Sequence, residues 1–222
     1  MTRKQKSLRN IDKIRKINPI SPEYDLIREA AGIIKNGGII SFPTTCLYGL
    51  GADAYNADAV DRVFAIKQRP DNQPILVLVK NITELDRVVR YVPPTALRII
   101  DSFWPGRVTI VFEAKDTLPD KLTAGTGKIG VRLPKHAVAL ALLNALDGPI
   151  TGTSANISGG AACSRVSNLD FRVADQLDLI LDAGPLQGGI GSTIVDITDN
   201  SPKILREGKV TAKHIFAVLD RH

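Results

Sequence analysis

Basic, hydroxyl-bearing and amide side chains recur at the ends of the strands that this sequence predicts. In chain order they are Thr44, Tyr48, Lys67, Arg69, Lys128, Arg132, Ser154, Asn156, Ser192 and Arg206. Loops at strand ends converge on ligand clefts in α/β domains. Arginine binds carboxylate and phosphate groups as a fork, and lysine binds them as a point charge. The set therefore predicts a site for an anionic ligand, although each residue alone is more typical of a surface charge or a turn.

Two glycine-containing segments are candidate phosphate-binding loops, but neither fits a known motif of that kind. AGTGK at 124–128 is similar to the end of a Walker A motif, but Leu122 stands where the first glycine belongs and Ile129 where a Ser or Thr is required. GPLQGGIGS at 184–192 lacks the GxGxxG spacing and precedes a predicted strand instead of a helix. Neither a P-loop nor a dinucleotide-binding fold is indicated.

Nucleophile and metal signals are weak as well. Cys46 lies in the first loop, and His136 is the one histidine that is not close to the C-terminal end. A Cys46–His136 pair stays open, although a small packed cysteine is the more typical interpretation. The sequence has no HExxH motif, cysteine cluster or paired DxD run. Catalysis would therefore rest on charge and positioning.

The segment 41–78 organises the predicted site. A strand at 38–42 ends at Pro43, and a hydroxyl-rich loop follows. Asn56 is a predicted helix N-cap, and Pro70 disfavours helix at Arg69. Lys67 and Arg69 therefore lie where this helix ends, before a strand at 75–79. The apolar face of the helix comprises Val60, Val63, Phe64 and Ile66.

The rest of the chain alternates between helices and strands. Helices are predicted at 22–34, 82–92, 95–103, 137–146, 168–177 and 211–219, and strands at 107–112, 129–133, 179–181, 192–197 and 204–206. No repeat or long linker divides them. This pattern predicts a single α/β domain with a mixed sheet, in which strand order is left open.

Charge is concentrated at the N-terminus. Of the net +6, residues 1–16 contribute seven basic residues and one acidic residue, so the other 22 basic and 22 acidic residues balance. We expect a basic leader at 1–20 and a folded domain at 21–222. The leader is either an arm for RNA phosphates or a solvated, partly disordered segment.

Localisation is predicted from hydropathy and cysteine use. No apolar stretch approaches the ~20 residues that cross a membrane, and no apolar segment follows the N-terminal charges. The two cysteines lack CxxC spacing. We therefore expect a cytoplasmic protein without a disulfide framework or membrane partner.

Several motifs in order resemble the YrdC/TsaC family of threonylcarbamoyl-AMP synthases over about residues 24–210. They are FPTTCLYGLGADA, KQRP, FWPGRVTIVF, IGVRLPKH, TSANISG, GSTIVD and ILREG. The resemblance implies a twisted open mixed sheet with flanking helices and a concave ligand-binding face. It also implies a nucleotidyltransferase that joins L-threonine, bicarbonate and ATP, with Mg²⁺, into threonylcarbamoyl-AMP and pyrophosphate. The product would pass to a downstream threonylcarbamoyl-transfer complex that modifies tRNA, with tRNA itself a further candidate partner.

The resemblance also implies roles for individual residues. Lys67 and Arg69 would be catalytic and contact the ATP phosphates. The other nucleotide contacts would be Gln73, Lys128, Asn156, Ser164 and Arg206. Arg132 would hold the threonine carboxylate, with Ser154 and Ser192 beside it. No protein metal ligand is expected, because Mg²⁺ would be held mainly by the ATP phosphates.

Two departures from the family pattern concern the amine substrate. Cys46 and Leu78 replace threonine-binding Thr and His residues of longer members, so they would form walls of the threonine pocket. Thr45 replaces a common acidic residue. Short members also lack that Thr and His, which favours the short, single-domain form. A non-catalytic RNA-binding relative, or a paralogue that uses another amine or carbamoyl donor, remains an alternative.

Overall fold

Two mixed β-sheets form the framework of the molecule. The structure is a computed structural model that describes residues 12–199 and 201–220. The first sheet has the strand order β1-β9-β2-β3-β8. Its strands are β1 (Ile14–Lys16), β9 (Leu179–Asp182), β2 (Ile40–Pro43), β3 (Tyr48–Gly51) and β8 (Thr153–Ser154). β9 runs parallel to β1 and β2, whereas β3 is antiparallel to β2 and β8.

The second sheet has the order β11-β10-β5-β6-β4-β7. Its strands are β11 (Lys203–Arg206), β10 (Thr193–Asp196), β5 (Val108–Glu113), β6 (Lys128–Arg132), β4 (Val77–Leu78) and β7 (Ile150–Thr151). The two sheets meet at residues 150–154, because β7 pairs with β4 and β8 pairs with β3. The predicted α/β fold with mixed pairing and flanking helices is confirmed, with its strands grouped in two sheets.

The predicted boundary of the N-terminal leader needs a correction. Residues 1–11 lie outside the described part of the chain. Ile14, however, pairs with Ile180 across β1 and β9, and Ile17 is buried. The folded domain thus includes residues that the sequence assigned to the leader, because the apolar side chains of 14–17 complete the edge of the first sheet.

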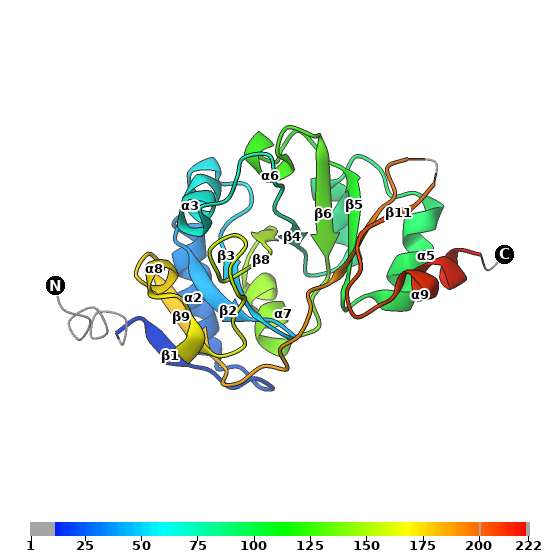
Figure 1. The fold of residues 1–222 in the computed structure, drawn as a ribbon. Coiled ribbons are helices and arrows are strands. Elements are labelled where there is room, and N and C mark those ends of the chain that lie inside the picture. Colours follow the sequence, from blue (N-terminus) through cyan, green and yellow to red (C-terminus); the bar gives the residue numbers. More distant parts are fainter. Residues whose placement is uncertain (1–11, 200, 221–222) are drawn as a thin grey trace.

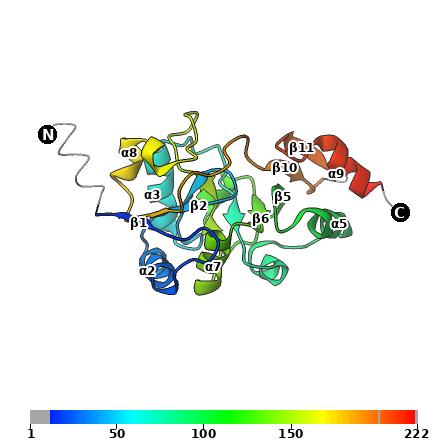
Figure 2. The same cartoon turned by 90° about the horizontal axis from the view of Figure 1, so that it is seen from below.

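Helices cover both faces of the first sheet (Figures 1 and 2). One apolar cluster joins α2 (Tyr24–Lys35) and α7 (Ala137–Ala145) to Ile40 and Phe42 of β2. The other joins α3 (Ala57–Lys67) and α8 (Phe171–Ala174) to Ile39 and Ile180. Successive strand side chains point to opposite faces. A buried and mostly apolar run such as Ile-Ile-Ser-Phe at 39–42 therefore contributes to both clusters.

The second sheet is covered mainly on one face. α5 (Pro94–Phe103) and α9 (Ala212–Leu219) pack together beside β5, β10 and β11 (Figure 2). Short helical segments complete the fold: 3₁₀ turns at Ile82–Glu84 and Val166–Asn168, α4 (Leu85–Val88) and α6 (Asp120–Thr123). β1 and α9 lie at opposite ends of the molecule.

Most differences from the predicted elements occur where long-range packing determines the backbone conformation. The predicted helix 168–177 shortens to α8, the helix 82–92 divides into a 3₁₀ turn and α4, and the strand 75–79 shortens to β4. Tyr48–Gly51, predicted as loop, is a strand. A Cβ on Gly51 would lie 2.9 Å from the Phe42 ring. Glycine, a poor strand former, is required there because the ring covers the strand.

No helix within residues 12–199 and 201–220 has the length and apolar composition that a membrane span requires.

Candidate active site

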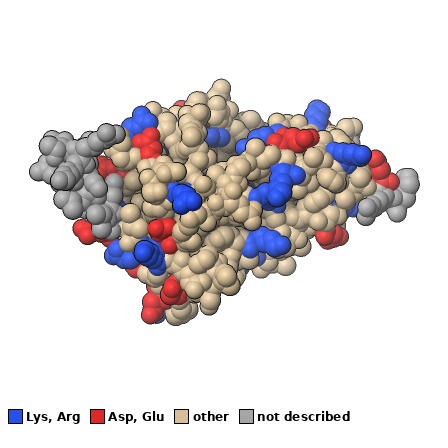
Figure 3. All heavy atoms as spheres, turned by 60° about the horizontal axis from the view of Figure 1, so that its bottom comes forward, with Lys and Arg blue, Asp and Glu red and all other residues tan. Residues whose placement is uncertain are grey.

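A cavity of about 650 Å³ lies where the two sheets meet, and it contains most of the predicted site residues. Figure 3 shows one face of the molecule with a hollow between its two halves and basic side chains in and beside it. The predicted residues that line the cavity are Thr44, Cys46, Arg69, Leu78, Lys128, Arg132, Ser154, Ser192 and Arg206. Lys67, Gln73, Asn156 and Ser164 are not among the lining residues.

The alternation of strand side chains produces the floor of this cavity. In β5, Val108, Ile110 and Phe112 belong to the apolar core, whereas Thr109 and Val111 line the cavity. In β6, Ile129 and Val131 are in the core, and the residues between and beside them line the cavity. The cavity is therefore the face of the second sheet opposite the core, which matches the predicted concave face.

Strand register brings Arg132 next to residues that are distant in sequence. Arg132 pairs with Leu78 across β6 and β4. β5 is antiparallel to β6 and parallel to β10, so the start of β5 lies beside both the end of β6 and the start of β10. The backbone amide of Thr193 donates to the carbonyl of Arg107 (3.0 Å). Arg107, Arg132 and Ser192 consequently meet at one edge of the cavity.

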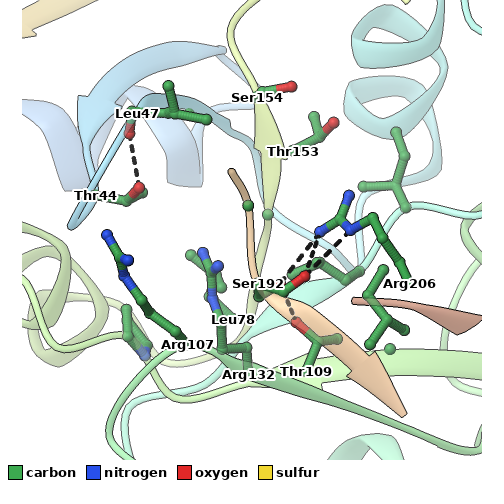
Figure 4. Close-up of a pocket in the computed structure, with 18 of the residues that line it drawn as sticks. Thr44, Leu47, Leu78, Arg107, Thr109, Arg132, Thr153, Ser154, Ser192 and Arg206 are labelled. Carbon is green, nitrogen blue, oxygen red and sulfur yellow. Dashed lines mark hydrogen bonds between the residues drawn. The ribbon is translucent and has the colours of Figure 1, made fainter. Parts of the chain in front are cut away.

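Three arginines form a cationic cluster in the cavity: Arg107, Arg132 and Arg206 (Figure 4). Nε of Arg132 is buried and has no hydrogen-bond partner among the residues that the structure describes. Burial, together with the positive charges of Arg206 and Arg107, lowers the pKa of Arg132 to about 10. Within the described part of the chain, none of the three forms an ion pair with a carboxylate. Uncompensated guanidinium groups in a partly desolvated cavity favour an anionic ligand.

Arg206 is held in place by Ser192. Its Nε and Nη2 donate to the carbonyl oxygen of Ser192 at 3.1 and 2.8 Å. The Ser192 hydroxyl is in turn 2.8 Å from the hydroxyl of Thr109. Burial lowers the pKa of Arg206. These contacts connect β11, β10 and β5, and they orient one guanidinium from the side of the cavity opposite Thr44 (Figure 4).

Lys128 and Asp196 form an ion pair on the cavity wall, with 3.1 Å between Nζ and Oδ2. Asp196 also accepts hydrogen bonds from the backbone amide and hydroxyl of Thr198. Burial alone would raise the pKa of Asp196, but the Thr198 hydrogen bonds and the Lys128 charge together lower it. Asp196 is the one carboxylate among the described residues that line the cavity.

Arg69 follows the end of α3, whose start and end are both specified locally. The Asn56 side chain accepts from the amide of Ala59 (3.0 Å), which confirms the predicted N-cap. The helix ends at Gln68 in a left-handed conformation with φ of 48°. Arg69 then donates from Nε to the carbonyl of Gln73 and from Nη2 to the carbonyl of Pro74, which fixes its guanidinium at the cavity wall.

Lys67 lies behind that wall. Its side chain is 1% exposed, and its ammonium donates to the carbonyl oxygens of Ser154 (2.6 Å) and Asn156 (2.8 Å). Burial, with a contribution from the positive charge of Arg69, lowers the pKa of Lys67 to about 8. In this structure Lys67 therefore joins α3 to the segment after β8, and its predicted contact with phosphate stays a prediction.

The other predicted residues outside the cavity support nearby loops. Asn156 donates from Nδ2 to the carbonyls of residues 157 and 160. The carbonyl of Gln73 accepts from Arg69, and that of Ser164 accepts from the amide of Leu186. Tyr48 is buried, with its hydroxyl donating to the carbonyl of Gly184. Their predicted ligand contacts are not tested by this arrangement.

Cys46 and Leu78 contribute apolar surface to the cavity. Cys46 is 7% exposed and Leu78 is fully buried. His136, the possible partner of Cys46, instead caps α7: its Nδ1 accepts from the amide of Val138 (3.2 Å). His136 is also absent from the cavity lining. A Cys46–His136 catalytic pair is therefore not formed in this structure.

Sequence reasoning missed five polar residues of the cavity: Arg107, Thr109, Thr126, Thr153 and Asp196. Arg107 is the first residue of the predicted strand 107–112, so its position at a strand end, which it shares with Lys128 and Arg132, was the signal that could have found it. Thr109 and Asp196 lie within strands, where the alternation of the side chains was the available signal.

Comparisons with known proteins place these features in a family. The Sua5/YciO/YrdC family model, described as "Telomere recombination", matches residues 32–208. A Bacillus subtilis protein named threonylcarbamoyl-AMP synthase is 34% identical over 194 residues, covering 87% of this chain and 56% of the relative. The chain thus spans little more than half of that relative's length.

Two solved structures have the same fold. Pyrococcus abyssi Sua5, solved in complex with L-threonine, matches with a TM-score of 0.87 and 33% identity, covering 93% of this chain and 61% of that one. Escherichia coli YciO matches with a TM-score of 0.83 and 31% identity, covering 91% of this chain and 98% of that one.

Proposed function

Because the chain belongs to the Sua5/YciO/YrdC family, we propose that it forms threonylcarbamoyl-AMP and pyrophosphate from L-threonine, bicarbonate and ATP. The observation that carries the proposal is the cavity itself. It is lined by five cationic side chains, Arg69, Arg107, Lys128, Arg132 and Arg206, and by one carboxylate, Asp196. All three substrates bear negative groups, and a cluster of this kind stabilises them and the charge that develops on phosphate.

The proposed reaction has two steps. The uncharged amine of threonine bonds to the carbon of bicarbonate, and water leaves, which yields a carbamate. A carbamate oxygen then bonds to the α-phosphorus of ATP, while the bond from that phosphorus to its bridging oxygen breaks and pyrophosphate leaves with the electron pair. No nucleophile from the protein takes part, so the unpaired state of Cys46 and His136 is compatible with this chemistry.

The residues of the chain would bind and orient the reactants. Arg132 would hold the threonine carboxylate, because its buried Nε finds no partner within the described part of the chain. Arg69 and Arg206 would contact the phosphates, since backbone carbonyls already fix both guanidinium groups. Lys67 would position Ser154 through its bond to the Ser154 carbonyl. Holding reactants in an attacking geometry is a major source of rate in such reactions.

Mg²⁺ belongs to this proposal as the metal that accompanies ATP. Mg²⁺ is usually held by one or two carboxylates together with substrate phosphates. The cavity wall offers Asp196, which is paired with Lys128, and the described residues contain no cluster of three or more metal-ligating side chains. This donor set fits a metal held mainly by the phosphate oxygens, whose charge it would neutralise.

The cellular context is a further part of the proposal. We place the reaction in the cytoplasm, supported by two cysteines that are both free. The product would serve a threonylcarbamoyl-transfer complex that modifies tRNA, and the protein would be a nucleotidyltransferase. The name of the Bacillus subtilis relative supports the product.

The test is a reconstitution with purified protein, ATP, L-threonine, bicarbonate and Mg²⁺. We expect equal amounts of pyrophosphate and threonylcarbamoyl-AMP, the latter identified by mass spectrometry. Omitting bicarbonate or threonine should abolish both products. Absence of the adenylate together with absence of ATP binding would refute the proposed function.

A further inference from the structure

Arg107 is a cavity residue to which the proposed reaction assigns no separate task. It follows the turn at 104–106 and enters the cavity beside Arg132, from the strand that neighbours β6 (Figure 4). Figure 4 draws the guanidinium groups of Arg107 and Arg132 next to one another, and the charge of Arg107 contributes, after burial and the charge of Arg206, to the lowered pKa of Arg132. Both point toward the loop that contains Thr44 and Leu47 (Figure 4).

The position of Arg107 is set by contacts that leave most of its donors free. Nη2 donates to Oε1 of Gln187 at 3.3 Å, and the backbone carbonyl of Arg107 accepts from Thr193. A guanidinium has five N–H donors in a rigid fork, which matches a carboxylate bidentately. Within the described residues, no carboxylate forms an ion pair with Arg107.

Two adjacent guanidinium groups repel one another, and partial burial adds a desolvation cost. A single carboxylate on Arg132 would leave the charge of Arg107 uncompensated. The two arginines are therefore better satisfied by a ligand that carries two anionic groups. Arg206 lies on the other side of Arg132 (Figure 4), where it donates to the Ser192 carbonyl, and as a third cation it adds to the uncompensated positive charge.

We propose that Arg107 and Arg132 form a paired site for an amino-acid-derived ligand with two carboxylate-type groups. Arg132 binds the amino-acid carboxylate, and Arg107 binds the second group. The inference rests on the proposed function, because it concerns the amino-acid subsite of the same cavity. The second group has two chemical sources: the carbamate that forms on the amine of threonine, or the side-chain carboxylate of aspartate or glutamate.

The apolar wall is compatible with both sources. Cys46 and Leu78 line the same cavity and offer no charged partner to a ligand. Among the cations of the cavity, Arg107 lies beside Arg132 (Figure 4), so recognition of the second group is assigned to Arg107. A neutral residue at position 107 would leave a site for one carboxylate only, so Arg107 determines which amino-acid species bind.

The experiment measures amino-acid affinity by calorimetry for the wild type, Arg107→Met and Arg107→Lys. Methionine keeps an unbranched apolar side chain and removes the charge. Arg28→Met is the matched control, because Arg28 is an exposed arginine on α2 that does not line the cavity. The probes are L-threonine in bicarbonate-free buffer, L-threonine with bicarbonate, L-aspartate and L-glutamate.

Loss of one charge-assisted contact should weaken binding by about 10- to 150-fold. A carbamate source predicts that Arg107→Met weakens threonine binding only when bicarbonate is present. A side-chain source predicts that it weakens binding of aspartate or glutamate without bicarbonate. In either case Arg107→Lys should lose less amino-acid affinity than Arg107→Met, and Arg28→Met should bind every probe with wild-type affinity.

Other outcomes would overturn the paired site. The paired site is excluded if Arg107→Met binds every amino-acid probe with unchanged affinity. It is also excluded if the variant loses equal affinity for threonine with and without bicarbonate, or loses affinity only for ATP. The proposed reaction fails separately: wild-type protein that binds these probes through Arg107 yet forms no adenylate refutes the reaction and leaves the paired site intact. Conversely, if the wild type forms the adenylate and Arg107→Met keeps its amino-acid affinity, the paired site is refuted and the proposed reaction stands.

Discussion

Replacing Lys67 with methionine is expected to change how the free energy of unfolding depends on pH. Lys67 is 1% exposed, and its folded-state pKa is lowered from 10.5 to about 8, first by burial and second by the charge of Arg69. Between these two pH values the unfolded chain holds a proton that the folded chain has released. The contribution of Lys67 to stability is therefore complete above the unfolded pKa and is lost as the pH falls through the folded pKa.

The size of the effect follows from the same two values. One pKa unit corresponds to about 1.4 kcal/mol. The part of the titration between pH 7 and pH 9.5 is then worth about 2 kcal/mol, and the full titration about 3 kcal/mol. The wild type should gain this amount relative to Lys67→Met. The variant also loses the hydrogen bonds of Lys67 to Ser154 and Asn156, which lowers its free energy of unfolding. The prediction concerns only how the difference between the two proteins changes with pH.

The assay is chemical denaturation of both proteins at half-unit steps from pH 7 to 9.5. The difference in free energy of unfolding, wild type minus variant, should rise steadily with pH. Lys35→Met provides a matched control, since Lys35 is an exposed lysine at the end of α2. A difference that stays level or declines with pH would refute the argument that Lys67 is a buried group whose charged form is disfavoured by the fold.

Three further predictions concern the site and the fold. Arg69→Met should raise KM for ATP and Arg132→Met should raise KM for threonine, each by about 10- to 150-fold in a pyrophosphate-release assay, and the opposite pattern would show that the subsites are exchanged. Gly208→Ala should destabilise the protein by about 1–3 kcal/mol, because its Cβ would lie 2.4 Å from a backbone oxygen. Gly32→Ala, whose Cβ would have nothing within 4 Å, should stabilise α2 by about 1 kcal/mol. Equal effects of the two substitutions in denaturant titrations would contradict the close backbone approach at Gly208. Thr109→Val removes the hydroxyl pair in the cavity floor and should cost about 1 kcal/mol in the same titrations, so wild-type stability would argue against that hydrogen bond.

The local parts of the fold could be predicted because they depend on near neighbours in the sequence. α3 begins directly after its N-cap Asn56 and ends before Arg69, as expected, since an N-cap and a following proline act within a few residues. The alternation in Lys-Ile-Gly-Val-Arg places Lys128 and Arg132 on one face of β6 in any sheet that this strand joins. The expectation that basic strand-end residues share a cavity was correct for Arg69, Lys128, Arg132 and Arg206.

Other features depended on pairings between distant segments, which local sequence does not encode. Arg107 joins the site because β5 lies between β6 and β10 in this register. Lys67 turns toward the carbonyls of Ser154 and Asn156 because the pairing of β8 with β3 brings that segment to the end of α3. Residue type and spacing alone determined that the chain carries cations for an anionic ligand. Only tertiary packing decided which of these cations face the cavity, because side-chain direction follows from the strand register and from the partners available inside the fold.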